Sequence, residues 1–369
     1  MEVYDLKYSL LFVLIMFLSE FVSGLSLFLY QKKNFINKNE NEQVFMGIKL
    51  IRSTITNIPH PDSSLKIYIL TFLISLLDFI EFLIQTYYCP LFLEGLRLNS
   101  NDGLFTFNTH LTSILALTSF LLYWKIFKSK IYRHQKLSLY IIFICTIFII
   151  VLDFFFEIFH YNNKITEIFI VFGLIFIEHF FYSIYEIIEK YLFEYNFMNP
   201  FQLLMIEGGF GCAIALIFIL FFLIISNRSF KEIIFENFNE KNAFPLIVLL
   251  FIYFILCGAR NTYKIVTNKI FSPMTLSLSY CILNPIMIII YIIVNNIKVK
   301  EEDIIIIFYD IPHLVLSLII VFFCCIYNEL IILFCCNLER DTHYEIYKRA
   351  DNDINMNYLL NDDDDIIEE

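Results

Sequence analysis

Nine long apolar segments recur along the chain, and they constrain its fold more than any other feature. A helix needs about 20 predominantly apolar residues to cross the hydrocarbon core of a bilayer. The segments are residues 8–30, 67–89, 106–127, 137–158, 165–188, 202–226, 244–266, 272–295 and 311–336. The chain is 59% hydrophobic, whereas soluble domains are closer to half apolar. The pattern therefore predicts an all-α membrane protein, a polytopic bundle of nine to ten transmembrane helices.

The tenth helix would come from residues 43–58. The stretch VFMGIKLIRSTITNI within that range is short for a span and carries Lys49 and Arg52. A segment of this length and charge favours a helix that lies in the membrane interface. We therefore expect the loop 31–66 to be interfacial, and the sequence leaves open whether it crosses the membrane.

The distribution of lysine and arginine predicts the orientation. With nine spans, 18 of the 26 lysines and arginines lie on the side that holds the C-terminus. Basic loops stay in the cytosol, so that side, with the acidic tail 337–369, is expected to be cytosolic. Asn227 begins an Asn-Arg-Ser glycosylation sequon and then falls on the lumenal side. We expect one transmembrane domain over residues 1–336, with halves of about 1–195 and 196–336, followed by a disordered tail.

Charge and motif content exclude several function classes. The net charge of −11 argues against nucleic-acid binding, which favours basic surfaces. The cysteines show neither a Cys-x-x-Cys pair nor Cys/His metal spacing, so no metal and no cofactor are expected. Tyr309-Asp310 is one half of an aspartyl-protease-like pair, but the partner motif is missing. With no nucleophile motif either, the chain is not expected to be an enzyme.

Ionisable side chains inside the apolar segments are the strongest functional signal. Such residues are rare in hydrocarbon and usually face a bundle interior or a wet cavity. Asp78 and Glu81 share one helical face because they are three residues apart. Tyr182, Tyr185 and Glu189 continue one stripe from Glu178. The candidate residues of a solute or ion path are Asp78, Glu81, Glu178, His179, Glu189, Lys190, Glu207, Arg260, Asn261 and Lys264.

Structural roles compete with that interpretation. Asp78 and Glu81 could form buried ion pairs with Arg260 or Lys264. Glu186, Glu189 and Lys190 could lie in the headgroup region, where charge costs little. Glu20 and Glu329 are expected to be interfacial or lightly buried, so neither is a candidate.

The stretch EKYLFEYNFMNPFQLLMIEGGFG, residues 189–211, joins two of the apolar segments. Pro200 suits the first position of a helix, because its missing N–H would be unsatisfied there anyway. Gly208 and Gly211 allow a neighbouring helix to approach closely. The stretch therefore predicts a tight helix contact with the carboxylate of Glu207 beside it.

The same stretch resembles a signature of the drug/metabolite transporter superfamily, in particular the F subgroup of solute carrier family 35, the nucleotide-sugar-transporter-like group. Four further stretches resemble that subgroup in the same order: ISLLDFIEFLIQTYY, LYWKIFKSKIYRHQKLSLYIIF, NTYKIVTNKIFSPMTLSLS and CCIYNELIILFCC. The resemblance extends from about residue 8 to residue 340.

The resemblance implies ten helices in two inverted halves of about five, which move a solute by alternating access. It also implies an endomembrane location such as Golgi, endosome or lysosome. The family's second helix would correspond to residues 44–58. Charged positions of the subgroup are replaced here by Thr109, Thr112, Leu276 and Tyr280, so an anionic substrate is in doubt.

The leading hypothesis is a transporter for a small-molecule solute, such as a nucleotide sugar or another small polar metabolite, that works among membrane lipid. The alternative is a non-transporting scaffold or sorting protein derived from a transporter. The sequence leaves open the solute, the coupling ion and whether the chain forms a homodimer.

Overall fold

The computed structural model describes most of the apolar part of the chain. The described residues are 4–35, 44–45, 48–49, 64–84, 112–128, 131–159, 165–226, 243–296, 303–334, 338–342, 345, 348 and 349. Glycosylation candidate Asn227 and most of the acidic tail lie outside them.

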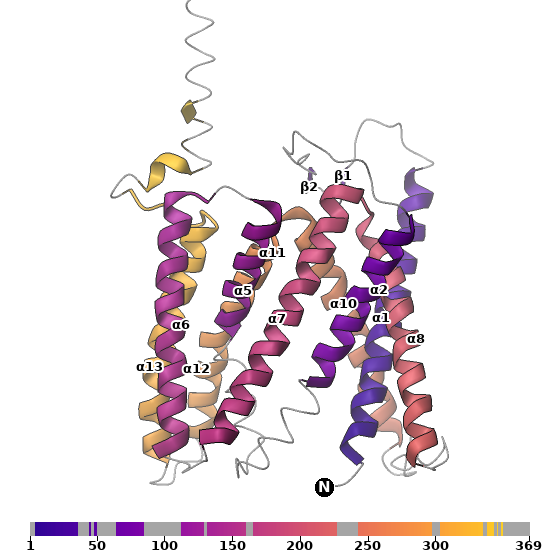
Figure 1. The fold of residues 1–369 in the computed structure, drawn as a ribbon, viewed down its shortest axis with the longest axis horizontal. Helices are drawn as coiled ribbons and strands as arrows, with labels where there is room; N and C mark the ends of the chain where they lie inside the picture. Colours follow the sequence, from indigo (N-terminus) through magenta and orange to yellow (C-terminus); the bar gives the residue numbers. More distant parts are fainter. Residues whose placement is uncertain are drawn as a thin grey trace, which may run out of the picture.

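Helices form nearly all of the described structure, which confirms the all-α prediction (Figure 1). They are α1 (Tyr4–Phe35), α2 (Ser64–Leu83), α5 (Thr112–Phe127), α6 (Arg133–Phe159), α7 (Ile165–Asn196), α8 (Pro200–Ser226), α10 (Ala243–Ile270), α11 (Pro273–Cys281), α12 (Leu283–Asn296), α13 (Asp303–Tyr327) and the 3-10 turn η2 (Glu339–Asp341). Each of the nine apolar segments contains one of these helices, and 272–295 contains two.

Within the described residues, six helical stretches are long and apolar enough to cross a membrane. They are Leu11–Lys33, Arg133–Phe156, Ile168–Asn196, Pro200–Ile225, Ile247–Ile270 and Pro273–Ile290. Thr112–Phe127 and Ile311–Tyr327 are shorter apolar helices. Large apolar side chains such as Ile224 and Phe244 are about three-quarters exposed on the outer surface. An apolar exterior of this kind is compatible with lipid around the bundle.

The interfacial helix expected at residues 43–58 differs from the structure where that segment is described. Val44–Phe45 and Ile48–Lys49 form two short strands, β1 and β2, which pair antiparallel. The remaining residues of the segment lie outside the described part. At these four positions the backbone amides bond across a tight hairpin instead of along a helix, so the interfacial helix is wrong there.

Two helix ends depart from the predicted boundaries. The last apolar segment was expected to continue to residue 336, but α13 ends at Tyr327. Glu329 adopts a left-handed backbone conformation with φ of 58°, and the N–H of Leu330 donates to the carbonyl of Cys325. This arrangement is a common way to end a helix. Similarly, the eighth segment divides at Ile282, just before Asn284 and Pro285.

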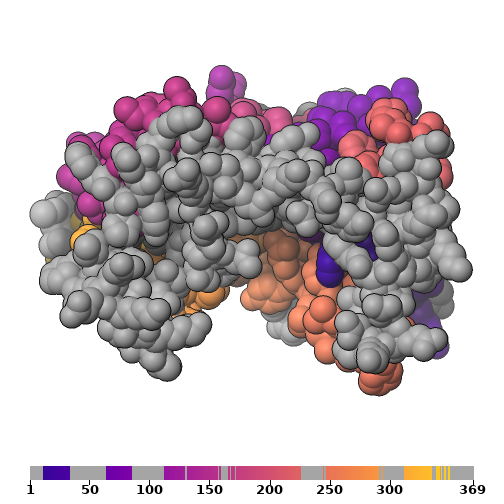
Figure 2. Space-filling model, turned by 90° about the horizontal axis from the view of Figure 1, so that it is seen from below, coloured from indigo at the N-terminus to yellow at the C-terminus, as the bar shows by residue number. Residues whose placement is uncertain are grey.

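The helices pack in two groups that α7 connects (Figure 1). In one group α1 packs against α8 and α10, and α2 packs against α8. In the other, α6 packs against α13, α5 against α11, and α12 against α13. Helix α7 contacts α2 and α10 in the first group and α5 and α11 in the second. Seen from below in Figure 2, the magenta atoms of the segment that includes α7 lie along one edge of the molecule, and orange atoms of the second half of the chain lie towards the opposite edge.

Glycines allow α1 and α8 to approach closely. A Cβ atom placed on Gly208 would lie 2.4 Å from the backbone N of Phe21, and one on Gly24 would lie 2.5 Å from the backbone N of Met205. On Gly211 it would lie 2.1 Å from the ring of Phe17. Contact at these distances is open only to glycine, as small-residue interfaces between membrane helices require.

Local hydrogen bonds fix the start of α8. Pro200 is its first residue, and Asn199 caps it by accepting the N–H of Phe201 through Oδ1 at 2.9 Å. Phe197 has a left-handed backbone with φ of 51°, which reverses the chain after α7. The turn brings the charged C-terminal part of α7 beside α8 and α10.

Candidate functional site

Polar and charged side chains gather where α1, α2, α7, α8 and α10 meet. Most of the residues predicted from the sequence are buried: Asp78, Glu178, His179, Glu189, Lys190, Glu207, Asn261 and Lys264. Glu81 is half-buried, and Arg260 is exposed. The structure therefore brings together carboxylates from four helices and the basic side chains of α10.

Three of the carboxylates form a compact group, which we call the carboxylate triad: Glu20 on α1, Asp78 on α2 and Glu207 on α8. One oxygen from each lies within 4.8 Å of the others. Glu20 accepts a short hydrogen bond from Nδ2 of Asn261 on α10. The Ser75 hydroxyl donates to the backbone carbonyl of Glu207 at 2.9 Å. The triad thus joins both halves of the chain at one buried point.

Lys264 supplies positive charge next to the triad. Its Nζ lies 3.9 Å from the ring centroid of Tyr185 and 4.3 Å from that of Tyr182. Both distances allow cation–π attraction, which is stronger away from water. The Tyr182 hydroxyl lies 2.9 Å from that of Tyr280 on α11. Lys264 also interacts electrostatically with Glu20, Asp78 and Glu207.

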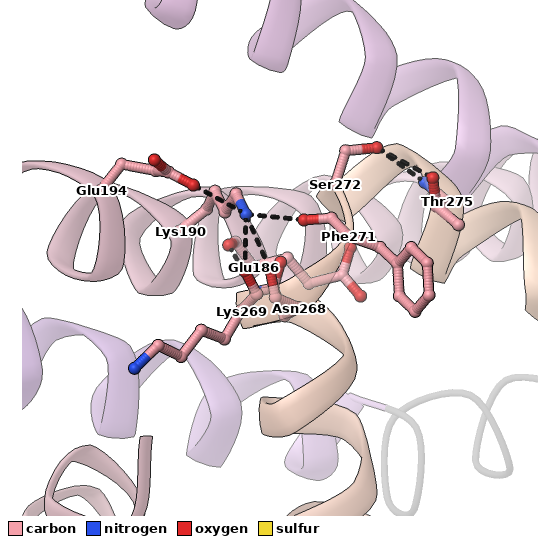
Figure 3. A network of polar contacts seen from close by, with 8 residues as sticks. All are labelled: Glu186, Lys190, Glu194, Asn268, Lys269, Phe271, Ser272 and Thr275. Atoms are coloured by element: carbon pink, nitrogen blue, oxygen red, sulfur yellow. Dashed lines mark hydrogen bonds and ion pairs between the residues drawn. The ribbon is translucent and has the colours of Figure 1, made fainter. Parts of the chain in front are cut away.

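A second network fixes the end of α10 against α7 (Figure 3). The Lys190 ammonium donates to the carbonyls of Asn268, Lys269 and Phe271 at 3.2, 3.0 and 2.6 Å. It also pairs with Glu194 at 3.0 Å. A cation at the C-terminus of a helix satisfies carbonyls that have no partner within that helix. The candidate Lys190 therefore has a clear structural role in this conformation.

Asn268 links that network to the buried carboxylates of α7. Its Nδ2 donates to Oε2 of Glu189 at 2.7 Å and to the backbone carbonyl of Glu186 at 2.9 Å. Both carboxyl groups are fully buried. Helices α10 and α11 cover this face of α7, so Glu186 and Glu189 are buried inside the bundle.

Hydroxyl groups surround the carboxylate of Glu186. Ser277 on α11 donates to its Oε2 at 2.9 Å, and Ser119 on α5 donates at 3.4 Å. Ser183 on α7 lies 2.6 Å from Thr118, oxygen to oxygen, and accepts from Ser119 at 3.1 Å. These contacts extend the polar region from the first group of helices into the second.

Several buried polar residues were not among the sequence-based candidates. Glu20 was set aside as interfacial, yet it is only 2% exposed. Asp153 on α6 and His313 on α13 pair at 3.2 Å and are both fully buried. Each of these is an ionisable residue inside a predicted apolar segment, which is the sequence signal that points to it.

The chain matches no protein-family model and none of the curated proteins with which it was compared. Its apolar helices are compatible with an integral membrane protein.

Proposed function

We propose that this protein is a transmembrane transporter of the drug/metabolite transporter type, which moves a small polar solute by alternating access. The observation that supports this proposal best is the convergence of buried charges from both halves of the chain. Glu20 and Asp78 come from the first half, and Glu207 and Lys264 from the second. Charged groups inside a membrane bundle are costly, and where they occur they usually mark a solute path or a binding site.

The packing of the helices supports two inverted repeats. If α1, α2, α5 and α6 correspond to α8, α10, α11 and α13, each helix runs opposite to its counterpart (Figure 1). Three counterpart pairs pack directly on each other: α1 with α8, α5 with α11 and α6 with α13. The contact of α1 with α10 is matched by that of α8 with α2, and α1–α2 by α8–α10.

Such exchange symmetry is the expected result of a two-fold axis in the membrane plane. In alternating access, the two halves exchange conformations about that axis. Helix α7 is the additional element of the first half, and the correspondence gives nine spans in all. Under this proposal the triad and Lys264 lie beside the α1–α8 pair, where relative movement of the halves would change their surroundings.

The charge balance bears on the kind of solute. The buried carboxylates of Glu20, Asp78, Glu189 and Glu207 outnumber the basic side chains near them. An anionic solute would add to this negative charge. The site therefore favours a neutral solute or one that carries a cationic group over a nucleotide sugar.

The ends of the helices agree with the orientation that lysine and arginine favour. The ends of α5, α7, α10 and α13 and the start of α6 lie at one end of the bundle (Figure 1). We assign this end, and the tail that follows α13, to the cytosol. An endomembrane location completes the proposal.

Access from water is the direct test. Single cysteines at positions 78, 207 and 264, in a background without the nine natural cysteines, should react with a hydrophilic thiol reagent from at least one side of sealed vesicles. A cysteine at Ile149, fully buried on α6, is the control that should stay unlabelled. If all three test positions are as inert as position 149, the polar path does not exist and the scaffold alternative is favoured.

Transport itself is measured in proteoliposomes with candidate solutes. Asp78→Asn and Lys264→Met should each abolish saturable uptake. The control is Glu194→Gln, which changes a charge at the end of α7, outside the carboxylate triad. Uptake that survives both substitutions at the wild-type rate would contradict the assignment of the path.

A further inference from the structure

The carboxylate triad has an unusual combination of burial, charge and unmet hydrogen bonding. Glu207 is fully buried, and neither of its side-chain oxygens has a hydrogen-bond partner among the described residues. Oε2 of Glu20 likewise has no hydrogen-bond partner among the described residues. Nearly all buried polar atoms in folded proteins have a partner. These carboxylate oxygens are therefore available to a ligand.

The distances between the carboxylate oxygens decide which kind of ligand fits. A proton shared by two carboxyl groups would require oxygens about 2.5–2.7 Å apart, which would count as a hydrogen bond, and Glu207 makes none. Oxygens that bind one Ca²⁺-sized ion at about 2.4 Å lie at most about 4.8 Å from each other. The oxygens of Glu20, Asp78 and Glu207 lie within 4.8 Å of one another. Glu207 thus shares no proton with the other two carboxyl groups, and the three oxygens lie within the reach of one ion.

The type of the ligand atoms and the charge of the carboxylates narrow the choice of ion further. All three are carboxylate oxygens, and an all-oxygen site favours hard cations such as Ca²⁺, Mg²⁺ and Mn²⁺. In the ionised form that binds a metal, the three carboxylates carry three negative charges. Lys264 interacts with each of them, and the charges of Glu189 and Arg260 nearby offset each other. A divalent cation together with Lys264 would neutralise the group. A monovalent cation would leave one negative charge uncompensated in a low-dielectric interior.

We propose that Glu20, Asp78 and Glu207 form a binding site for one divalent cation between α1, α2 and α8. The site holds the two halves of the chain together, since Glu207 comes from the second half and the other two ligands from the first. This inference concerns equilibrium binding, and it does not depend on whether the protein transports a solute.

Mn²⁺ is the probe, because free Mn²⁺ in solution has an electron paramagnetic resonance signal that is lost on binding. Full-length protein in nanodiscs of uncharged phosphatidylcholine should bind one Mn²⁺ per chain, and Ca²⁺ should compete for it. Glu207→Gln and Glu20→Gln, which keep the size of the side chain, should each weaken binding at least tenfold, since even changes around the direct ligands of a metal cost about 10–100-fold.

Two control variants separate the site from other acidic groups. Asp153→Asn removes a carboxylate that is equally buried but lies between α6 and α13, so it should leave the affinity unchanged. A variant with the four tail aspartates 362–365 changed to asparagine tests the acidic tail. This variant should also bind Mn²⁺ with the affinity of the wild type.

Three results would overturn the proposal. One is wild-type protein that binds no Mn²⁺ at millimolar concentration. Another is binding that disappears with the tail aspartates and persists in Glu207→Gln. The third is competition by Na⁺ as strong as that by Ca²⁺, which would show that charge does not select the ion. Since the wild-type titration alone can give the first result, the test does not depend on the variants folding.

Discussion

The close contact between α1 and α8 leads to a sharp prediction for Gly208→Ala. The added methyl carbon would lie 2.4 Å from the backbone N of Phe21 and 2.8 Å from the carbonyl oxygen of Phe17. Ordinary contacts of a Cβ begin at 3.4 Å, so the helices must separate locally by about 1 Å. Backbone atoms cannot rotate away as a flexible side chain can. Overpacking of this kind costs about 1–3 kcal/mol, partly offset by about 1 kcal/mol from the better helix propensity of alanine.

Gly209→Ala is the matched control on the same helix. Its methyl group would meet only the ring of Phe21, at 3.6 Å, so it gains helix propensity without a clash. The free energy of unfolding of both variants is measured by denaturant titration in mixed micelles. We expect Gly208→Ala to be less stable than Gly209→Ala by about 1–3 kcal/mol. Equal stability of the two variants would show that α1 and α8 are not in this close contact.

Three further predictions concern stability and use the same unfolding assay. Lys190→Met should cost about 2–4 kcal/mol because the carbonyls at the end of α10 lose their donor, and Glu194→Gln should cost clearly less. Asp153→Leu should cost about 3–5 kcal/mol because His313 loses its buried partner, whereas the double variant with His313→Leu should recover most of that loss. Tyr185→Leu should lower the free energy of unfolding by about 1–2 kcal/mol, because the ammonium group of Lys264 loses the aromatic ring that it contacts. A double Asp153/His313 variant no more stable than the single one would contradict the pairing of these two side chains.

The helices could be predicted well from the sequence, since hydrocarbon thickness sets their length. Each predicted apolar segment overlaps at least one helix of the structure. The end of α13 could not be predicted, because residues 328–336 are as apolar as the helix itself. There the backbone conformation of Glu329 and the hydrogen bond to Cys325 decide the boundary, and neither is visible in hydropathy.

The composition of the candidate site could be predicted only in part. Periodicity placed Glu178, Tyr182, Tyr185 and Glu189 on one stripe of α7, but it gave no information about what covers that stripe. Burial depends on the neighbouring helices, so the sequence could not show that Asn268 of α10 encloses Glu189. Glu20 was dismissed for the same reason. Its partners come from α2, α8 and α10, far away in sequence.

The glycine contact and the proposed cation site are two consequences of the same geometry. Glu207 directly precedes Gly208, and a methyl group on Gly208 would lie 2.9 Å from the Cβ of Glu20. A separation of α1 and α8 by about 1 Å would therefore move the carboxylate of Glu20 away from that of Glu207 and loosen the grip of the three oxygens on one ion.

Gly208→Ala should accordingly weaken Mn²⁺ binding at least tenfold, whereas Gly209→Ala should bind as the wild type does. Bound Mn²⁺ should in turn stabilise the wild type more than Gly208→Ala, because a ligand stabilises the state that it binds. If Gly208→Ala is destabilised yet binds Mn²⁺ normally, the helix contact is real but the ion is bound elsewhere. The two variants thus separate the packing of the bundle from the identity of its ligand site.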